Sequence, residues 1–126
     1  MGCKIMGRML SFSTAGVPPE VMGIGPAFAI PAALKKTGLE IKDIDIFEIN
    51  EAFASQAAYC VKTLGVPEEK LNPRGGAIAL GHPLGMTGAR MIVTLFSELE
   101  RTNKKYGLVS MCIGTGMGAC GVFERE

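Results

Sequence analysis

The chain has 126 residues, of which 48% are hydrophobic and 20% are charged, and its net charge at pH 7 is +1. This length suits one domain with its own core, and the near-neutral charge gives no sign of the basic surface that nucleic-acid-binding domains carry. No stretch reaches the roughly 18 consecutive apolar residues of a membrane-spanning helix. The sequence therefore predicts a globular domain that binds neither nucleic acid nor membrane.

The four cysteines and the single histidine do not form a metal-binding pattern. Their spacing lacks the paired Cys-x-x-Cys motifs of zinc sites, so no metal is expected. The chain has no secretory signal peptide, and its cysteines are therefore expected to be reduced in an intracellular compartment. Each of them, taken alone, is readily explained as a small buried hydrophobic residue: Cys3, Cys60, Cys112 and Cys120.

The N-terminal quarter predicts a strand followed by a helix. Residues 8–14 alternate loosely in polarity, as a strand with one buried face does. A helix is expected over 27–36, because Pro26 suits a first helical position, where its missing N–H costs nothing. Pro31 inside this stretch predicts that the helix is bent or that it begins later.

The middle of the chain repeats the strand-helix order. Residues 44–49 are apolar on both faces, which is typical of a buried strand. Residues 54–64 follow helical spacing and are ended by Gly65 and Pro67, in the order that helix termination favours.

The remaining elements complete an α/β pattern. A strand is expected over 77–80, a long amphipathic helix over 88–100 and two strands over 106–113 and 121–124. The order is βαβαβαββ, which predicts a layered α/β domain.

Asn50 is the first polar residue after the expected strand at 44–49. One interpretation makes it the N-cap of the next helix, with Glu51 in the first turn complementing the helix dipole. The other interpretation is that its amide orients a polar group or a water at a carbonyl oxygen. Local sequence leaves both open.

His82 lies in the loop Gly81-His82-Pro83-Leu84-Gly85, before the long helix. A lone histidine is often structural, but glycines let the backbone approach a ligand closely. If the loop points His82 at the N-terminus of the following helix, the dipole favours the neutral imidazole. Such an imidazole can activate a thiol or hydrogen-bond an oxyanion.

Cys112 closes an expected buried strand and is followed by three alternating glycines, Gly114, Gly116 and Gly118. These glycines can present backbone N–H groups to an anion or an oxyanion. A dinucleotide-binding fingerprint is excluded, because the segment leads into a strand and completes no G-x-G-x-x-G motif. All three regions are expected just past strand ends, where open α/β sheets bind their ligands.

Taken together and in this order, Asn50-Glu51-Ala52-Phe53, Gly81-His82-Pro83 and Cys112-Ile113-Gly114 resemble the C-terminal half of the thiolase family. The resemblance extends along essentially the whole chain and is strongest to the degradative, peroxisomal 3-ketoacyl-CoA thiolases. It implies a thiolase-like layered half-domain over residues 1–126, with a mixed sheet and helices on both faces. The family's N-terminal half, with its nucleophilic cysteine and loop domain, is absent from this sequence.

The resemblance implies thiolytic cleavage of 3-ketoacyl-CoA by coenzyme A through a cysteine thioester, giving acetyl-CoA and a shortened acyl-CoA. Coenzyme A is then a substrate, and neither a cofactor nor a metal is needed. His82 would activate the nucleophilic cysteine, and Asn50 would hold a water of the first oxyanion hole. Cys112 would be the general acid/base, the Gly114 N–H would lie in a second oxyanion hole, and Phe53 would line the acyl pocket.

The resemblance also implies partners: acyl-CoA and coenzyme A, a thiolase N-terminal half, and a second subunit in a homo-oligomer within the peroxisome. Cys3, Cys60 and Cys120 lack the family's Cys-x-Ser-Gly turn, so a fragment of this extent is expected to be inactive alone. One alternative is a non-catalytic thiolase-fold module for interaction or dimerisation. Ketoacyl synthases share the architecture but carry histidine at the position of Cys112.

Overall fold

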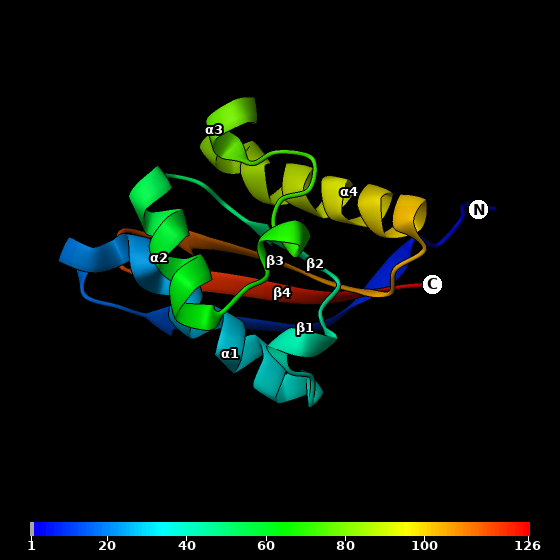
Figure 1. The fold of residues 1–126 in the computed structure, drawn as a ribbon, viewed down its shortest axis with the longest axis horizontal. Coiled ribbons are helices and arrows are strands. Elements are labelled where there is room, and N and C mark those ends of the chain that lie inside the picture. The colour runs from blue at the N-terminus through cyan, green and yellow to red at the C-terminus, as the bar shows by residue number, and fades with distance from the viewer. Residues whose placement is uncertain (1) are drawn as a thin grey trace.

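A four-stranded mixed sheet lies between two helices in the computed structural model, which describes residues 2–126 (Figure 1). Strand β4 runs antiparallel to both of its neighbours, β1 and β3, while β2 pairs in parallel with β3 at the sheet edge. The order across the sheet is β1 (Gly7–Gly16), β4 (Met117–Arg125), β3 (Tyr106–Ile113) and β2 (Ile46–Ile49). The predicted α/β class, with a mixed sheet and helices on both faces, is confirmed.

The helices are α1 (Gly25–Thr37), α2 (Ala54–Leu64), α3 (Ala77–Leu80) and α4 (Leu84–Thr102), with short 3₁₀ turns at Pro19–Ile24, Ile41–Asp43 and Glu68–Lys70. The strand expected over 77–80 is wrong, because these residues form α3, and the order is therefore βαβαααββ. The prediction of a bent or later-starting first helix is also wrong in its starting point: α1 begins at Gly25 and continues through Pro31.

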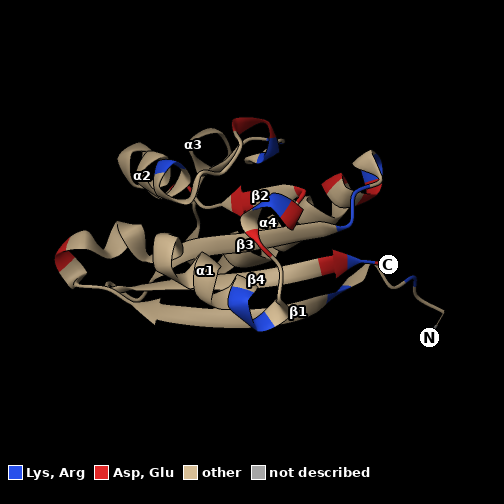
Figure 2. Cartoon of the chain, turned by 60° about the horizontal axis from the view of Figure 1, so that its bottom comes forward, with Lys and Arg blue, Asp and Glu red and all other residues tan. Residues whose placement is uncertain are grey.

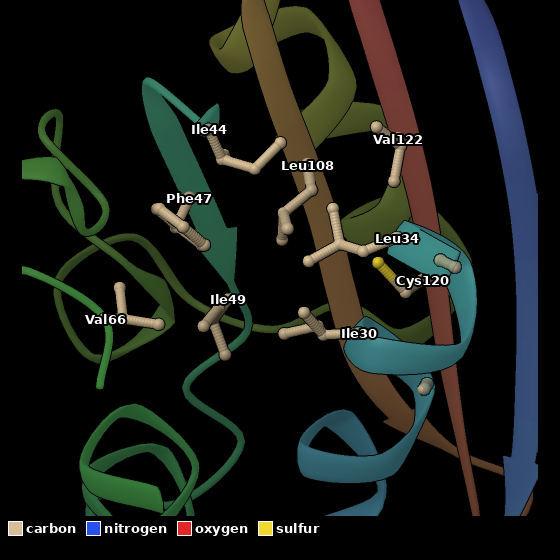
Figure 3. Packing of buried hydrophobic residues seen from close by; sticks show 11 residues of the cluster. Ile30, Leu34, Ile44, Phe47, Ile49, Val66, Leu108, Cys120 and Val122 are labelled. Atoms are coloured by element: carbon tan, nitrogen blue, oxygen red, sulfur yellow. The ribbon is translucent and has the colours of Figure 1, made fainter. Parts of the chain in front are cut away.

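Helix α1 covers one face of the sheet and α4 covers the other. Side chains alternate along the strands, so that Leu108 and Val122 join the core under α1, while Val109 and Phe123 join the core under α4. Figure 3 shows Ile30 and Leu34 of α1 pointing at the α1-side residues of β2, β3 and β4. Burying each such side chain contributes about 1.5–3 kcal/mol, so the two cores together hold both helices on the sheet.

Helix α4 packs closely against the opposite face. A Cβ on Gly107 would lie 2.4 Å from the Leu95 side chain, so only glycine lets the helix approach at this point. Phe96 meets Phe123 edge to face, with ring centroids 5.7 Å apart. This packing holds α4 against β3 and β4.

Two glycines bring the start of α1 into backbone contact with β4. A Cβ on Gly118 would lie 2.1 Å from the carbonyl oxygen of Gly25, and a Cβ on Gly25 would lie 2.6 Å from the backbone of Gly118. Neither side can give way by a side-chain movement, because both contacts are to main-chain atoms. Gly118 also pairs with Cys112 across the β3–β4 ladder, so this crossing supports a predicted site residue.

At the outer edge of β2, Leu71 forms an isolated parallel bridge with Phe47, and the hydrogen bonds come from the next residue, Asn72. Its N–H donates to the Phe47 carbonyl at 2.8 Å. Its side-chain amide accepts from the Ile49 N–H and donates to the Ile49 carbonyl, both at 2.9 Å. These three bonds hold the end of β2 in place just before Asn50.

Charged residues lie mostly towards the ends of the elements, with acidic and basic segments interspersed (Figure 2). The middle of the sheet carries neither sign, as the uncoloured lengths of β1, β3 and β4 show. Among residues 2–126, no helix is long and apolar enough to span a bilayer.

A buried ion pair links β2 to α4. Glu48 is fully buried, and its Oε2 lies 3.3 Å from Arg90 Nη1. Burial raises the pKa of Glu48 to about 7, and the neighbouring Glu51 and Glu98 carboxylates add to the increase, while Arg90 opposes it. Glu48 Oε1 and Arg90 Nη2 have no partner among residues 2–126, so the pair is incompletely satisfied.

Replacing Glu48 with glutamine is expected to change the pH dependence of folding. The pKa of this carboxyl is raised from 4.5 to about 7, so the folded chain keeps a proton that the unfolded chain releases between those values. The contribution of Glu48 to stability therefore falls as pH rises through this window, by up to about 1.4 kcal/mol per pH unit, and the loss is complete above the folded pKa.

The measurement is urea unfolding of wild type and Glu48→Gln in matched buffers on either side of the window. Wild type should lose stability relative to the variant as pH rises, because glutamine does not ionise. Subtracting the two curves removes the contribution of titrating groups that do not interact with Glu48. A difference in unfolding free energy that stays constant with pH would contradict the role of Glu48.

Candidate functional site

Parallel pairing brings the ends of β2 and β3 together. Ile49 is in register with Ser110, and the Asn50 N–H donates to the Ser110 carbonyl at 2.9 Å. Asn50 therefore lies at the same end of the sheet as Cys112, which is the penultimate residue of β3. His82 reaches the same end of the sheet from the helix α3 and not from a strand. The prediction that all three regions follow strands is therefore wrong for His82.

Asn50 is buried, and its side chain is directed at the histidine. Its Nδ2 lies 3.3 Å from His82 Nε2, and its carbonyl accepts a bond from Gln56 Nε2 at 3.2 Å. The N-cap interpretation of Asn50 is wrong, because α2 begins only at Ala54 and the backbone before it is extended at Phe53. Gln56 was not identified from the sequence, although it holds the turn between Asn50 and α2.

Glu51 anchors the loop that carries His82. Its carboxylate accepts the Ile78 N–H at 3.0 Å and the Asn72 Nδ2 at 3.2 Å. A Cβ on Gly76 would lie within 2.5 Å of this carboxyl group, so glycine is required for the approach. The expectation that Glu51 complements the dipole of α2 is wrong; the residue secures the start of α3.

The imidazole of His82 is held at both nitrogens. Nε2 faces Asn50, and Nδ1 lies 2.7 Å from the hydroxyl oxygen of Thr87 in the first turn of α4. The loop thus brings His82 to the first turn of the long helix, which the sequence left as a condition; α4 begins at Leu84, four residues earlier than predicted. The ring is half-buried, with one part open to a cavity.

A cavity of about 490 Å³ brings four of the five predicted site residues together: Phe53, His82, Cys112 and Gly114 line it. Asn50 does not line the cavity and lies behind His82. The rest of the lining is mainly apolar and was not predicted as part of the site: Met22, Ala52, Leu84, Met111, Ile113 and Thr115. An apolar cavity with a few convergent polar groups is the usual form of a small-molecule site.

Cys112 rests as a thiol in this environment. The residue is half-buried, and burial raises the pKa of its thiol above the ordinary value. Burial therefore favours the protonated form of Cys112. A protonated thiol at neutral pH can donate a proton to a carbanion, whereas it is a poor nucleophile.

The other cysteines do not resemble nucleophiles. Cys60 and Cys120 are buried, and burial raises the pKa of both thiols, that of Cys120 to about 12. Cys60 donates to the Gly23 carbonyl at 3.6 Å, and Cys120 belongs to the core under α1. Cys3 is exposed and precedes β1. None of these three cysteines lines the cavity beside Cys112.

Gly114 begins a tight turn between β3 and β4. Its φ is +55°, and that of Thr115 is +59°, so two consecutive residues adopt the left-handed conformation. Within residues 2–126, no backbone or side-chain group accepts a bond from the Gly114 N–H. An unengaged N–H beside the cavity is suited to an oxyanion. The same residues hold no group of three or more His, Cys, Asp or Glu side chains that could ligate a metal.

Comparisons with known proteins agree with this geometry. The family model "Thiolase, C-terminal domain" matches residues 3–125. A Mus musculus protein named 3-ketoacyl-CoA thiolase B, peroxisomal, is 69% identical over 98% of this chain and 30% of its own length. The Homo sapiens protein named 3-ketoacyl-CoA thiolase, peroxisomal, is 66% identical over the same shares. The chain thus spans about 30% of the length of the curated relatives it matches.

Solved structures give the same result. The dimeric peroxisomal thiolase of Saccharomyces cerevisiae matches with a TM-score of 0.92 and 62% identity, over 98% of this chain and 31% of that one. A Bacillus anthracis acetyl-CoA acetyltransferase matches with a TM-score of 0.96 and 43% identity, over 99% and 32%. Since the family model and the folds cover nearly every residue, this chain belongs to the thiolase family and corresponds to its C-terminal domain.

Proposed function

We propose that the chain is the proton-transfer half of a 3-ketoacyl-CoA thiolase, acting on acyl-CoA and coenzyme A in the peroxisome. The observation that carries the proposal is the cavity at which the Cys112 thiol, the His82 imidazole and the Gly114 backbone meet. Names of the relatives support the substrate class and the location. Coenzyme A serves as a substrate, and the reaction needs neither a metal nor a bound cofactor.

The reaction divides between this domain and a nucleophilic cysteine in a complementary half. His82 takes the proton of that cysteine, whose sulfur then attacks the 3-keto carbonyl. Breaking the carbon–carbon bond leaves an acyl thioester on the cysteine and an acetyl-CoA enolate. Cys112 donates its proton to the enolate carbon, giving acetyl-CoA. The Cys112 thiolate next takes the proton of incoming coenzyme A, whose sulfur attacks the acyl thioester. The nucleophilic cysteine leaves as a thiolate and takes back the proton held by His82, so the shortened acyl-CoA is released and both cysteines and the histidine are restored.

Developing negative charge on oxygen needs fixed donors. The Asn50 amide contacts the His82 ring and does not itself line the cavity. In this proposal it orients the ring and holds a water of the first oxyanion hole. The Gly114 N–H serves the enolate oxygen in the second hole, and Phe53, which is 61% exposed, forms part of the acyl pocket. Removing one donor of this kind typically costs about 2.7–4 kcal/mol of transition-state stabilisation.

An exposed apolar face supports the need for a complementary half. Beside α4, a groove of about 330 Å³ is lined by Met9, Phe12, Ile92 and neighbouring residues, and Met9 and Phe12 are more than half exposed. The yeast relative is described as a five-layered α-β-α-β-α structure made from two core domains of identical topology. Two three-layered domains give five layers when they share one helical layer, and α4 would lie in the shared layer. A second subunit completes the proposed homo-oligomer, as in the dimeric yeast enzyme.

The proposal predicts that the isolated chain has no thiolase activity and that activity appears when a complementary half is supplied. A suitable vehicle is the yeast peroxisomal thiolase with its corresponding segment replaced by this chain, since the two are 62% identical. The chimaera should cleave 3-ketoacyl-CoA in a coenzyme A-dependent assay, with the unmodified yeast enzyme as the positive control.

Size-exclusion chromatography and thermal unfolding identify a folded chimaera before activity is scored. A folded, dimeric chimaera without thiolysis would overturn the proposal and favour a non-catalytic interaction module, for which the exposed Met9 and Phe12 provide a surface. Turnover by the isolated chain would overturn the assignment of the nucleophile to another half.

A further inference from the structure

Thr87 carries a buried hydroxyl, and its only side-chain partner among residues 2–126 is the histidine of the site. The residue is 1% exposed and lies in the first turn of α4, five positions after His82. Its Oγ1 lies 2.7 Å from His82 Nδ1 and 3.0 Å from the Pro83 carbonyl oxygen. Burying a hydroxyl without a hydrogen-bond partner costs free energy, and these two contacts supply the partners.

Counting protons fixes the direction of each bond. A threonine hydroxyl has one proton, and the Pro83 carbonyl can only accept, so the hydroxyl donates to Pro83. Oγ1 is then an acceptor towards the imidazole, which places a proton on His82 Nδ1. The second ring contact is compatible with this tautomer, because the Asn50 Nδ2–H group lies 3.3 Å from Nε2 and can donate to a lone pair there.

We infer that Thr87 is a positioning residue that holds His82 as the neutral Nδ1–H tautomer, with the Nε2 lone pair directed to Asn50 and the cavity. Imidazole side chains in water favour the opposite tautomer, Nε2–H, so the site works against this preference. The catalytic consequence rests on the proposed function, in which Nε2 takes the proton of the nucleophilic thiol. A ring with its proton already on Nε2 cannot accept another there while neutral.

The tautomer is measurable in the chain itself, because His82 is its only histidine. Long-range ¹H–¹⁵N correlation spectra of the ¹⁵N-labelled chain distinguish a protonated ring nitrogen from an unprotonated one. The informative variants are Thr87→Val, which keeps the shape and removes the acceptor, and Thr87→Ser, which keeps the hydroxyl. The matched control is Thr102→Val, since Thr102 also bonds a carbonyl one turn back in α4, that of Glu98, and is distant from His82 in the helix.

Wild type, Thr87→Ser and Thr102→Val should carry the proton on Nδ1, and Thr87→Val should shift towards Nε2–H. Backbone amide spectra identify variants that remain folded. The inference is overturned if wild type is mainly Nε2–H, or if folded Thr87→Val keeps the wild-type tautomer.

Kinetics in the chimaera separate this inference from the proposed function. Thr87→Val should lower kcat by roughly 10- to 100-fold at a nearly constant KM, because losing a positioned general base altogether costs about 10²–10⁴-fold. Thr87→Ser should restore most of the rate, and Thr102→Val should leave it unchanged. A tautomer shift with an unaltered kcat would leave the structural inference standing and overturn the proposed role of His82 Nε2.

Discussion

Replacing Cys112 with alanine in the chimaeric enzyme is expected to lower kcat for thiolysis by about 10²–10⁴-fold, the usual contribution of a positioned general acid/base. The thiol lines the cavity, and burial raises its pKa, so it enters the reaction protonated and able to quench the enolate. The specific readout is exchange of the acetyl-CoA methyl protons with deuterated water. This exchange needs the carbon-acid step alone, and it should disappear in the variant.

Cys60→Ala is the matched control, because Cys60 is a buried thiol that does not line the cavity. It should retain the deuterium exchange, with a modest loss of stability from the lost packing. Wild-type exchange in folded Cys112→Ala would exclude Cys112 as the acid/base and leave only a packing role. Loss of exchange in both variants would point to a general distortion of the site.

The largest expected effect on folding is that of Gly118→Ala. A methyl group there would lie 2.1 Å from the Gly25 carbonyl oxygen and 2.2 Å from its carbon, so α1 would have to move away from β4. Overpacking normally costs about 1–3 kcal/mol when side chains can adjust. Because these contacts are to backbone on both elements, we expect a loss at or above the top of that range, measured by urea unfolding of the isolated chain.

Gly85→Ala provides the control for this substitution. Gly85 lies in α4, and a Cβ there would meet nothing within 4 Å. Alanine is a better helix former than glycine by about 0.5–1 kcal/mol, so this variant should be neutral or more stable. A Gly118→Ala protein as stable as wild type would mean that the α1–β4 crossing is looser than the backbone contacts indicate.

Hydrophobic periodicity was sufficient to predict most of the fold. The alternation along 8–14 and the helical spacing along 54–64 depend on which face is buried, and both correspond to elements of the structure, β1 and α2. The segment 77–80 was misassigned because four apolar residues fit a buried strand and a single helical turn equally well. Its conformation is decided by distant contacts, above all the Glu51 carboxylate on the Ile78 N–H.

The site residues were predictable to the extent that a motif marks them. His82, Cys112, Gly114 and Phe53 line one cavity, and Asn50 contacts His82, as the thiolase-like motifs imply. Their supporting residues have no such motif. Thr87 is one more small polar residue near a helix start, and only the folded loop between α3 and α4 brings its hydroxyl to the imidazole.

Asn72 also has a consequence for association between copies of this chain. An unpaired strand edge is a template for edge-to-edge sheet extension, and β2 is one of the two edges of this sheet. Asn72 occupies the Phe47 carbonyl and both backbone groups of Ile49, so a further strand cannot pair there. Of the two sheet edges within residues 2–126, that of β1 is the one left for sheet extension, and pairing along it could join two copies but not a third. The residue that holds Asn50 in place thus also protects the sheet from growing into a fibre.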